Sequence, residues 1–200
     1  MNVNMKRLIA TALFSTILLQ QIPVSFAQTT RLTSTVDILG LEESNNGANI
    51  TFAPLAEGLL VTARVDNEGR GDFLTIQSAL AQIKTGVIIV SSGIYNEHNL
   101  VVPDGVLVRG GYDSRSWQKT AEDQTIVLGS KHAATFILQK ASALQNIVLR
   151  QAETAVRVAY GPATISQIAI ADSKKAIELS PYSTLRIAHS DFVKNEIVLA

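Results

Sequence analysis

Two aspartates and three lysines near the end of the chain are the residues whose types and spacing could do chemistry. Asp172 and Asp191 are close to one sequence repeat apart, and each lies in a polar turn that follows alternating apolar residues. If these turns stack on neighbouring coils, the two aspartates lie about 4.8 Å apart. Lys174, Lys175 and Lys194 follow closely, so the cluster could bind Ca²⁺ or an acidic sugar. Solvent-exposed turns also favour Asp and Lys, and we favour this simpler interpretation.

The same cluster bears on the choice between catalysis and binding. A polysaccharide lyase needs a basic side chain that removes a proton next to a uronate, commonly with a cation held by carboxylates. The two aspartates and three lysines could supply both requirements. Ca²⁺ is the one cofactor implied, and only for this alternative.

Aromatic and histidine side chains give weaker signals. Tyr112 and Trp117 could form a platform on which a sugar ring stacks, although covering a core edge at the base of a loop is the commoner role. His98, His132 and His189 lack the spacing of metal ligands, so we predict no metal site.

The elements that must position these residues are short strands that repeat with a period of roughly 20 residues. Residues 144–199 contain three units, each with two alternating apolar segments joined by a polar turn. The second segments contain Val156, Ile177 and Ile197, and we align these three residues with one another. Such strands cannot bury an apolar face alone, whereas a stack of them forms a continuous core. The pattern predicts a solenoid with long flat faces suited to extended polymers.

One helix precedes the strands. Apolar residues at i, i+3, i+4 and i+7 from Ile76 form one helical face. Thr75 can cap the start of this helix and Gly86 can end it. From residue 87 onward the pattern predicts strands and turns with no further helix.

The region before the helix is predicted to contain short strands. Alternating or apolar segments lie at residues 36–39, 50–52 and 59–65, with a turn signal at 45–47. We interpret residues 28–70 as an N-terminal β segment or extension.

Residues 1–27 have the organisation of an export signal. Lys6 and Arg7 precede an apolar run over residues 8–19 that is too short to span a membrane comfortably, and Ala27 ends a small-residue cleavage site. An uncleaved membrane anchor is the alternative. We expect cleavage, with no membrane span afterwards and a periplasmic or extracellular location.

The composition of the mature chain limits its partners and its means of stabilisation. The signal holds two of the 17 basic side chains and none of the 17 acidic ones, so the mature chain has a slight excess of negative charge. Because no basic patch stands out, nucleic acid and anionic membranes are poor candidate partners. The chain has no Cys, so its stability must come from the core.

A resemblance to a known fold family covers residues 69–200. The segments that carry it are 71–80, 87–90, 92–97 and 105–113. The first three resemble the N-terminal part of right-handed parallel β-helix proteins of the pectin-lyase-like superfamily. The last, with Trp117 after it, is similar to a narrower set of secreted bacterial β-helix proteins of unknown function. The resemblance implies an all-β fold over residues 71–200, a right-handed parallel β-helix with a short N-terminal capping helix.

The opening of this region also resembles pectin methylesterases, whose catalytic region has a Gln, two Asp and an Arg. Gln151 fits the first of these positions. Lys174 and Lys175 stand where the resemblance requires the acid/base Asp. Asp191 matches the second Asp only loosely, and the Arg would fall beyond Ala200. With this set incomplete, we do not expect an active pectin methylesterase.

The C-terminal residues 197–200 read as part of an apolar strand. We therefore expect a β-helix that is open or truncated at its C-terminal end. A second copy joined end to end, or a partner, could cover such an end.

These observations favour a secreted, non-catalytic β-helix scaffold that binds a polysaccharide or a cell-surface protein on a flat face. The alternative is a polysaccharide-active enzyme of the pectate-lyase or pectinesterase type. No catalytic residue can be assigned from the sequence.

Overall fold

The computed structural model of the chain describes residues 29–32, 36–39 and 61–200. The expected signal peptide, the strand expected at 50–52 and the turn expected at 45–47 lie outside the described residues. The predicted strand at 36–39 is present, and the strand expected at 59–65 is present from residue 61.

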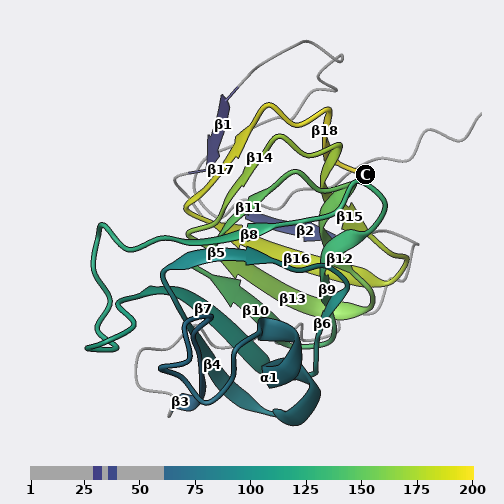
Figure 1. The fold of residues 1–200 in the computed structure, drawn as a ribbon. Helices are drawn as coiled ribbons and strands as arrows, with labels where there is room; N and C mark the ends of the chain where they lie inside the picture. Colours follow the sequence, from purple (N-terminus) through teal and green to yellow (C-terminus); the bar gives the residue numbers. More distant parts are fainter. Residues whose placement is uncertain (1–28, 33–35, 40–60) are drawn as a thin grey trace, which may run out of the picture.

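The described chain is an all-β parallel solenoid with one short helix (Figure 1). Sheet A contains, in spatial order, β1 (Thr29–Leu32), β17 (Ser190–Val193), β14 (Ala169–Ala171), β11 (Val148–Arg150), β8 (Thr125–Leu128) and β5 (Gly93–Asn96). Sheet B contains β2 (Val36–Leu39), β16 (Ser183–Ala188), β13 (Gly161–Ser166), β10 (Ser142–Gln145), β7 (Val106–Tyr112), β4 (Gly86–Ser91) and β3 (Val61–Val65). Sheet C contains β18 (Ile197–Leu199), β15 (Lys175–Leu179), β12 (Thr154–Val158), β9 (Ala134–Leu138) and β6 (Leu100–Val102).

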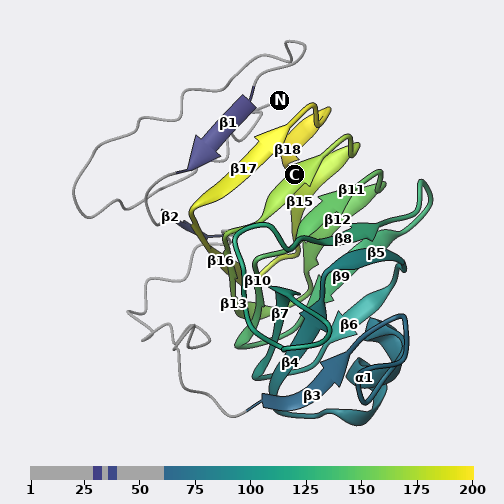
Figure 2. The ribbon, with the colours of Figure 1, turned by 60° about the vertical axis from the view of Figure 1, so that its left-hand side comes forward.

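Each coil passes through the three sheets in the order B, A, C (Figure 2). Five coils have all three strands, from β4–β5–β6 to β16–β17–β18, and an initial turn contributes β3 and the helix. Strands of successive coils pair in parallel. The expectation of strands and turns from residue 87 onward is therefore confirmed.

The core is a set of stacked apolar rows. Leu144, Ile165 and Ile187 occupy equivalent positions on β10, β13 and β16, and each is at most 1% exposed. Burying one such side chain stabilises the fold by roughly 1.5–3 kcal/mol relative to leaving it exposed. The repeat therefore stabilises the protein only when coils lie on one another.

The register confirms one expected alignment of the repeat and corrects the other. Val156 pairs with Ile177, as predicted. Ile177 pairs with Leu199, so the last coil is longer than expected, and the predicted alignment of Ile177 with Ile197 is wrong. The predicted alignment matched Asp191 to Asp172 because both are aspartates in polar turns. The register is instead set by the residues at which the chain turns from one sheet to the next.

Each of these corners is made by a residue with positive φ. Gln151, Asp172 and Lys194 form the corner between sheets A and C, and Asn146, Gln167 and His189 form the corner between sheets B and A. None of these corner residues is β-branched, as this left-handed conformation requires. The Asp172 N–H donates to the Val193 carbonyl at 3.2 Å, so hydrogen bonding between coils continues through the corner. Asp172 thus stands level with Lys194.

The helix α1 (Ile76–Gln82) packs against the first strands of the solenoid. Thr75 caps its start as predicted, with its hydroxyl accepting from the Ser78 N–H. Both carboxylate oxygens of Glu97 accept from the backbone N–H groups of residues 76 and 77, at 2.9 and 2.8 Å. The helix ends before Ile83, and Gly86 instead begins β4, because residue 83 is already extended.

Two of the three strands in the last coil have a strand paired to their outer edge. β1 pairs antiparallel with β17, and β2 pairs antiparallel with β16 (Figure 2). In the part of the chain that is described, β18 pairs only with β15. The sequence led us to expect an open C-terminal end. At sheets A and B this end is closed, because the outer edges of β17 and β16 offer free backbone groups with which β1 and β2 pair.

An asparagine amide joins the last two coils. The Asn195 Nδ2 group donates to the Ile170 carbonyl at 2.9 Å, and its Oδ1 accepts from the Ser173 N–H at 3.1 Å. The Ser173 hydroxyl in turn accepts from the Ala152 N–H at 3.2 Å, which extends the connection to the preceding coil. Buried backbone groups at the corner are satisfied in this way.

Replacing this amide should destabilise the solenoid. Asn195→Ala leaves two partly buried backbone groups without their partner, so we expect the free energy of unfolding to fall by about 1–3 kcal/mol. Denaturant unfolding followed by circular dichroism measures the change. Glu196→Ala, at the exposed neighbouring position, is the matched control. Equal midpoints for the two variants would contradict this role of Asn195.

Candidate binding groove

A loop of residues 113–124 leaves the solenoid between β7 and β8 and folds back over the corner between sheets B and A. Asp113 organises its start, since its Oδ1 accepts from the Ser116 N–H and hydroxyl, both at 2.7 Å. These hydrogen bonds hold the pKa of Asp113 below its usual value. Further on, Thr120 donates to Asp123 at 2.6 Å.

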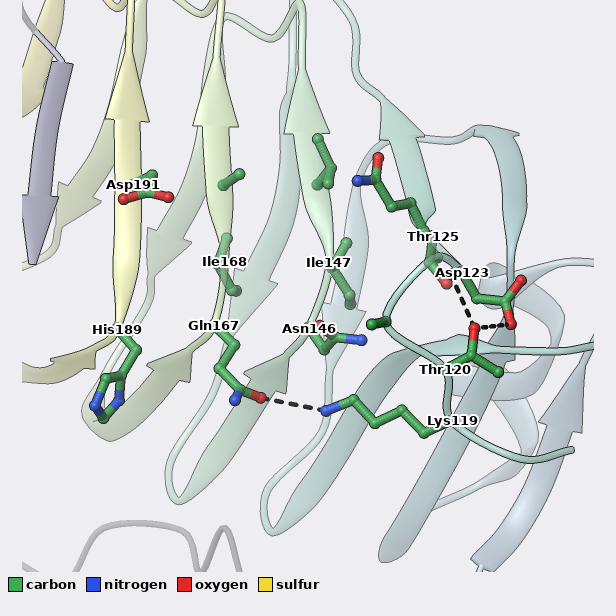
Figure 3. A pocket seen from close by; sticks show the side chains of 14 residues that line it. Lys119, Thr120, Asp123, Thr125, Asn146, Ile147, Gln167, Ile168, His189 and Asp191 are labelled. Carbon is green, nitrogen blue, oxygen red and sulfur yellow. Dashed lines mark hydrogen bonds between the residues drawn. The ribbon is translucent and has the colours of Figure 1, made fainter. Parts of the chain in front are cut away.

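This loop and the corner enclose a groove of about 390 Å³ (Figure 3). The loop contributes one wall, and the rest comes from the first residue of β8 and from the strands β11, β14 and β17 with their preceding corners. The residues that line it are Lys119, Thr120, Ala121, Asp123, Gln124, Thr125, Asn146, Ile147, Val148, Gln167, Ile168, Ala169, His189 and Asp191.

A row of polar side chains runs along the groove. Asn146, Gln167 and His189 come from three successive coils and lie in a line at the foot of their strands (Figure 3). The row exists because these residues form the left-handed corners and thus repeat at the coil spacing of about 4.8 Å. Amide and imidazole groups both donate and accept hydrogen bonds. The groove therefore repeats its polar chemistry along its length.

Hydrogen bonds orient two members of the row. The Asn146 Nδ2 group donates to the Gly110 carbonyl at 2.9 Å. The two backbones are so close here that a Cβ on Gly110 would lie 2.6 Å from the backbone carbonyl oxygen of Asn146. Gln167 Oε1 accepts from Lys119 Nζ and from Gln145 Nε2, each at 3.3 Å. Because Oε1 is engaged, the Gln167 amide nitrogen remains the group that can donate to a ligand.

The floor of the groove is apolar. Val148 and Ala169 face outward from sheet A and pair in register, while Ile147 and Ile168 beside them are almost fully buried. An apolar floor beside repeated polar groups suits a ligand with apolar faces and hydroxyl edges.

The two carboxylates of the groove lie far apart along it. Asp191 pairs with Ala169, and this register continues through Val148 to Ile126 of β8. Asp191 is therefore three strand spacings, or about 14 Å, from β8. Asp123 lies two residues before β8, at that far end of the groove. Pairs of carboxyl groups that hydrolyse glycosidic bonds lie about 5–9.5 Å apart. The spacing does not favour such a pair.

The structure separates the residues that the sequence singled out. The stacking of Asp172 on Asp191 that the sequence allowed does not occur, because Asp191 pairs with Ala169 while Asp172 pairs at the level of Lys194. Asp191 lines the groove, whereas Asp172 lies at the other corner of sheet A. The two-carboxylate cation site considered as an alternative is thus not assembled from these two residues.

Ion pairs engage most of the charged residues at the corner between sheets A and C. Asp172 accepts from Arg150 Nη2 at 2.7 Å, and Lys174 donates to Glu153 at 2.8 Å. The hydrogen bond to Glu153 raises the pKa of Lys174. Lys194 is exposed and makes no ion pair with the described residues. Exposed ion pairs of this kind contribute little to stability.

Lys175 belongs to a second ion pair. Its Nζ lies 3.3 Å from Glu178, whose other oxygen accepts from Arg157 Nε at 2.9 Å. Partial burial acts to raise the pKa of Glu178, but the hydrogen bond and charge of Arg157, together with Lys175, outweigh it and lower the pKa. These contacts are consistent with the simpler interpretation of the lysines as turn and strand residues on the surface.

The two aromatic candidates lie at the base of the loop. Tyr112 and Trp117 are half-buried against an apolar cluster on the outer face of sheet B that includes Leu107. The Arg64 guanidinium lies 5.4 Å from the centre of the Trp117 ring, a cation–π contact. Both side chains therefore cover an apolar surface beside the groove and do not line it.

The described residues contain no group of three or more His, Cys, Asp or Glu side chains placed to hold a metal ion. Nor does any helix among them have the length and apolar character of a membrane span.

The sequence analysis missed the polar row. Its signal is present in the sequence, since Asn146, Gln167 and His189 are polar residues that recur 21 and 22 residues apart. An alignment of the repeat by its apolar positions and by the residue types of its turns does not compare these corner residues, although they share a backbone conformation.

No family model matches the chain, and neither a curated protein nor a solved structure is significantly similar to it.

The contacts of Glu178 predict a pH-dependent stability. Its pKa is lower in the folded protein than in the unfolded chain, so its contribution is present above about pH 4.3 and is lost as the pH falls through the folded value. The loss of unfolding free energy caused by Glu178→Gln should therefore be largest near neutral pH and shrink below about pH 4. Urea unfolding across this range tests it, with the exposed Glu122→Gln as control. A loss independent of pH would contradict the ion-pair account.

Proposed function

We propose that the protein is a secreted, non-catalytic scaffold that binds an extended polysaccharide in the groove beside the 113–124 loop. The polar row of Asn146, Gln167 and His189 carries this proposal, because it repeats the same kind of hydrogen-bonding group at the coil spacing. A polymer with a repeated hydroxyl pattern can engage several such groups at once. The apolar floor adds contact area for the faces of the sugar rings.

The charges of the groove support a hydroxyl-rich ligand rather than a strongly anionic one. Lys119 is the basic residue among those that line it, while Asp123 and Asp191 are acidic. A polyanion would meet two carboxylates for one ammonium group. Hydrogen bonds to neutral sugars carry no such repulsion.

Further parts of the proposal concern the fold and the location. Right-handed coiling, membership of the pectin-lyase-like superfamily and a capping role for α1 are supported by the segments of resemblance and by the packing of α1 on β3 and β6. Right-handed connection of parallel strands is also the strong general preference. Export is supported by the basic, apolar and small-residue pattern of residues 1–27.

A polysaccharide-active enzyme is the second candidate. It is favoured by one observation, the presence of Asp123, His189 and Asp191 in the same groove, since these groups can transfer protons. The wide separation of Asp123 from Asp191 along sheet A argues against these two carboxylates acting on one bond. Lys174 and Lys175, at the position where a pectin methylesterase needs its acid/base Asp, argue against that activity.

Removing members of the polar row should weaken glycan binding. For a glycan identified on an array of neutral and acidic polysaccharides, we expect Gln167→Ala and His189→Ala each to raise the Kd by about threefold to tenfold, the effect of one lost hydrogen bond. Isothermal titration measures these values. Tyr182→Ala is the control, because Tyr182 is 69% exposed and outside the groove lining. Unchanged affinity in both groove variants would refute the assignment of the groove.

The absence of catalysis is tested separately. The purified chain is incubated with uronate polysaccharides, with and without Ca²⁺, and unsaturated products, released methanol and reducing ends are measured. We expect none above the buffer control. Product that is lost in Asp191→Asn or Asp172→Ala would replace the scaffold with a small lyase, esterase or hydrolase.

A further inference from the structure

The N-terminal strands are joined to the solenoid in a way that no other described strand is. β1 and β2 make the only antiparallel strand pairings in the described part of the chain, and each has one partner strand there. Their partners, β17 and β16, belong to the last coil. β1 and β2 therefore occupy the edge of the stack as added strands and not as part of a coil.

The register of these pairings sets residues of opposite charge type at paired backbone positions. Arg31 pairs with Asp191 in β1–β17, and Asp37 pairs with Arg186 in β2–β16. Residues directly opposite in an antiparallel pair are neighbours on one face, where opposite charges favour pairing and like charges oppose it. The basic residue is on the N-terminal strand at one position and on the last coil at the other. A shifted register would lose both pairs of opposite charge.

The segment that connects β2 to β3 is long enough for β1 and β2 to pair with the last coil of their own chain or with that of a second copy of the chain. β2 and β3 lie at opposite ends of sheet B, six strand spacings or about 29 Å apart. Residues 40–60 join them, and a chain of that length can extend to about 70 Å. The tether is thus long enough to reach the last coil of its own chain or that of a neighbour.

We propose that the last coil is a strand-accepting surface whose partner is the β1–β2 segment of a second copy of the chain. The segment exchanges with the chain's own, and the two charge positions select it. The same backbone pairs form within one chain and between two, so protein concentration decides between monomer and exchanged dimer. The Arg31–Asp191 position shares Asp191 with the groove lining, whereas the Asp37–Arg186 position lies outside it.

Complementary charge reversals test the exchange. A donor-reversed chain carries Arg31→Asp with Asp37→Arg, and an acceptor-reversed chain carries Arg186→Asp with Asp191→Arg. Each chain alone then faces like charges at both positions. In a mixture, each β1–β2 segment meets opposite charges only on the last coil of the other variant. The two chains are given different isotope labels, mixed at high concentration and examined by native mass spectrometry.

We expect the mixed dimer to exceed each unmixed dimer by at least about fivefold. A chain with all four substitutions has opposite charges at both positions again, so its proportion of monomer to dimer should equal that of the unaltered protein. Mixed dimers at or below the statistical proportion would overturn the proposal.

A second measurement needs no substitutions. Labelled and unlabelled unaltered chains, mixed at high concentration, should give mixed-isotope dimers that dissociate on dilution. Monomers alone at every concentration would also overturn the proposal.

Discussion

The structure depends on one constraint, which is that a coil of three short strands cannot bury its own apolar side chains. Inward residues are covered by their equivalents on neighbouring coils, as in the row of Leu144, Ile165 and Ile187. Coils must therefore stack in register, and the register must be held where the chain turns. The left-handed corners hold it, since they repeat with the coils and pass hydrogen bonds from one to the next.

The same corners create the candidate site. A residue that must adopt positive φ without β-branching is often polar, and here three of them project beside the 113–124 loop. The groove is thus a consequence of how the coils turn. The ends of the stack follow from the same constraint, because the last coil exposes strand edges. The N-terminal strands pair with two of these edges.

Much of the fold could be predicted from the sequence, and the site could not. Period-2 apolar segments predicted the parallel solenoid, and the spacing of Ile76 and its helical neighbours predicted α1. The alignment failed at Ile197, because matching Asp191 to Asp172 by residue type misplaced the corner, which is at Lys194. The same misplaced corner is the reason that the sequence allowed Asp172 and Asp191 to stack. The antiparallel return of β1 and β2 is a long-range pairing, which no local pattern specifies.

The central claim is that the amides of the polar row contact the glycan. Two-dimensional NMR of the ¹⁵N-labelled protein, titrated with an oligosaccharide of the bound glycan, observes side-chain NH₂ groups directly. The account predicts that the NH₂ signals of Asn146 and Gln167 shift together with ligand concentration, while that of Asn195, which joins coils away from the groove, stays in place. Shifts confined to Asn195, or the absence of any shift at Asn146 and Gln167 under saturating ligand, would contradict it.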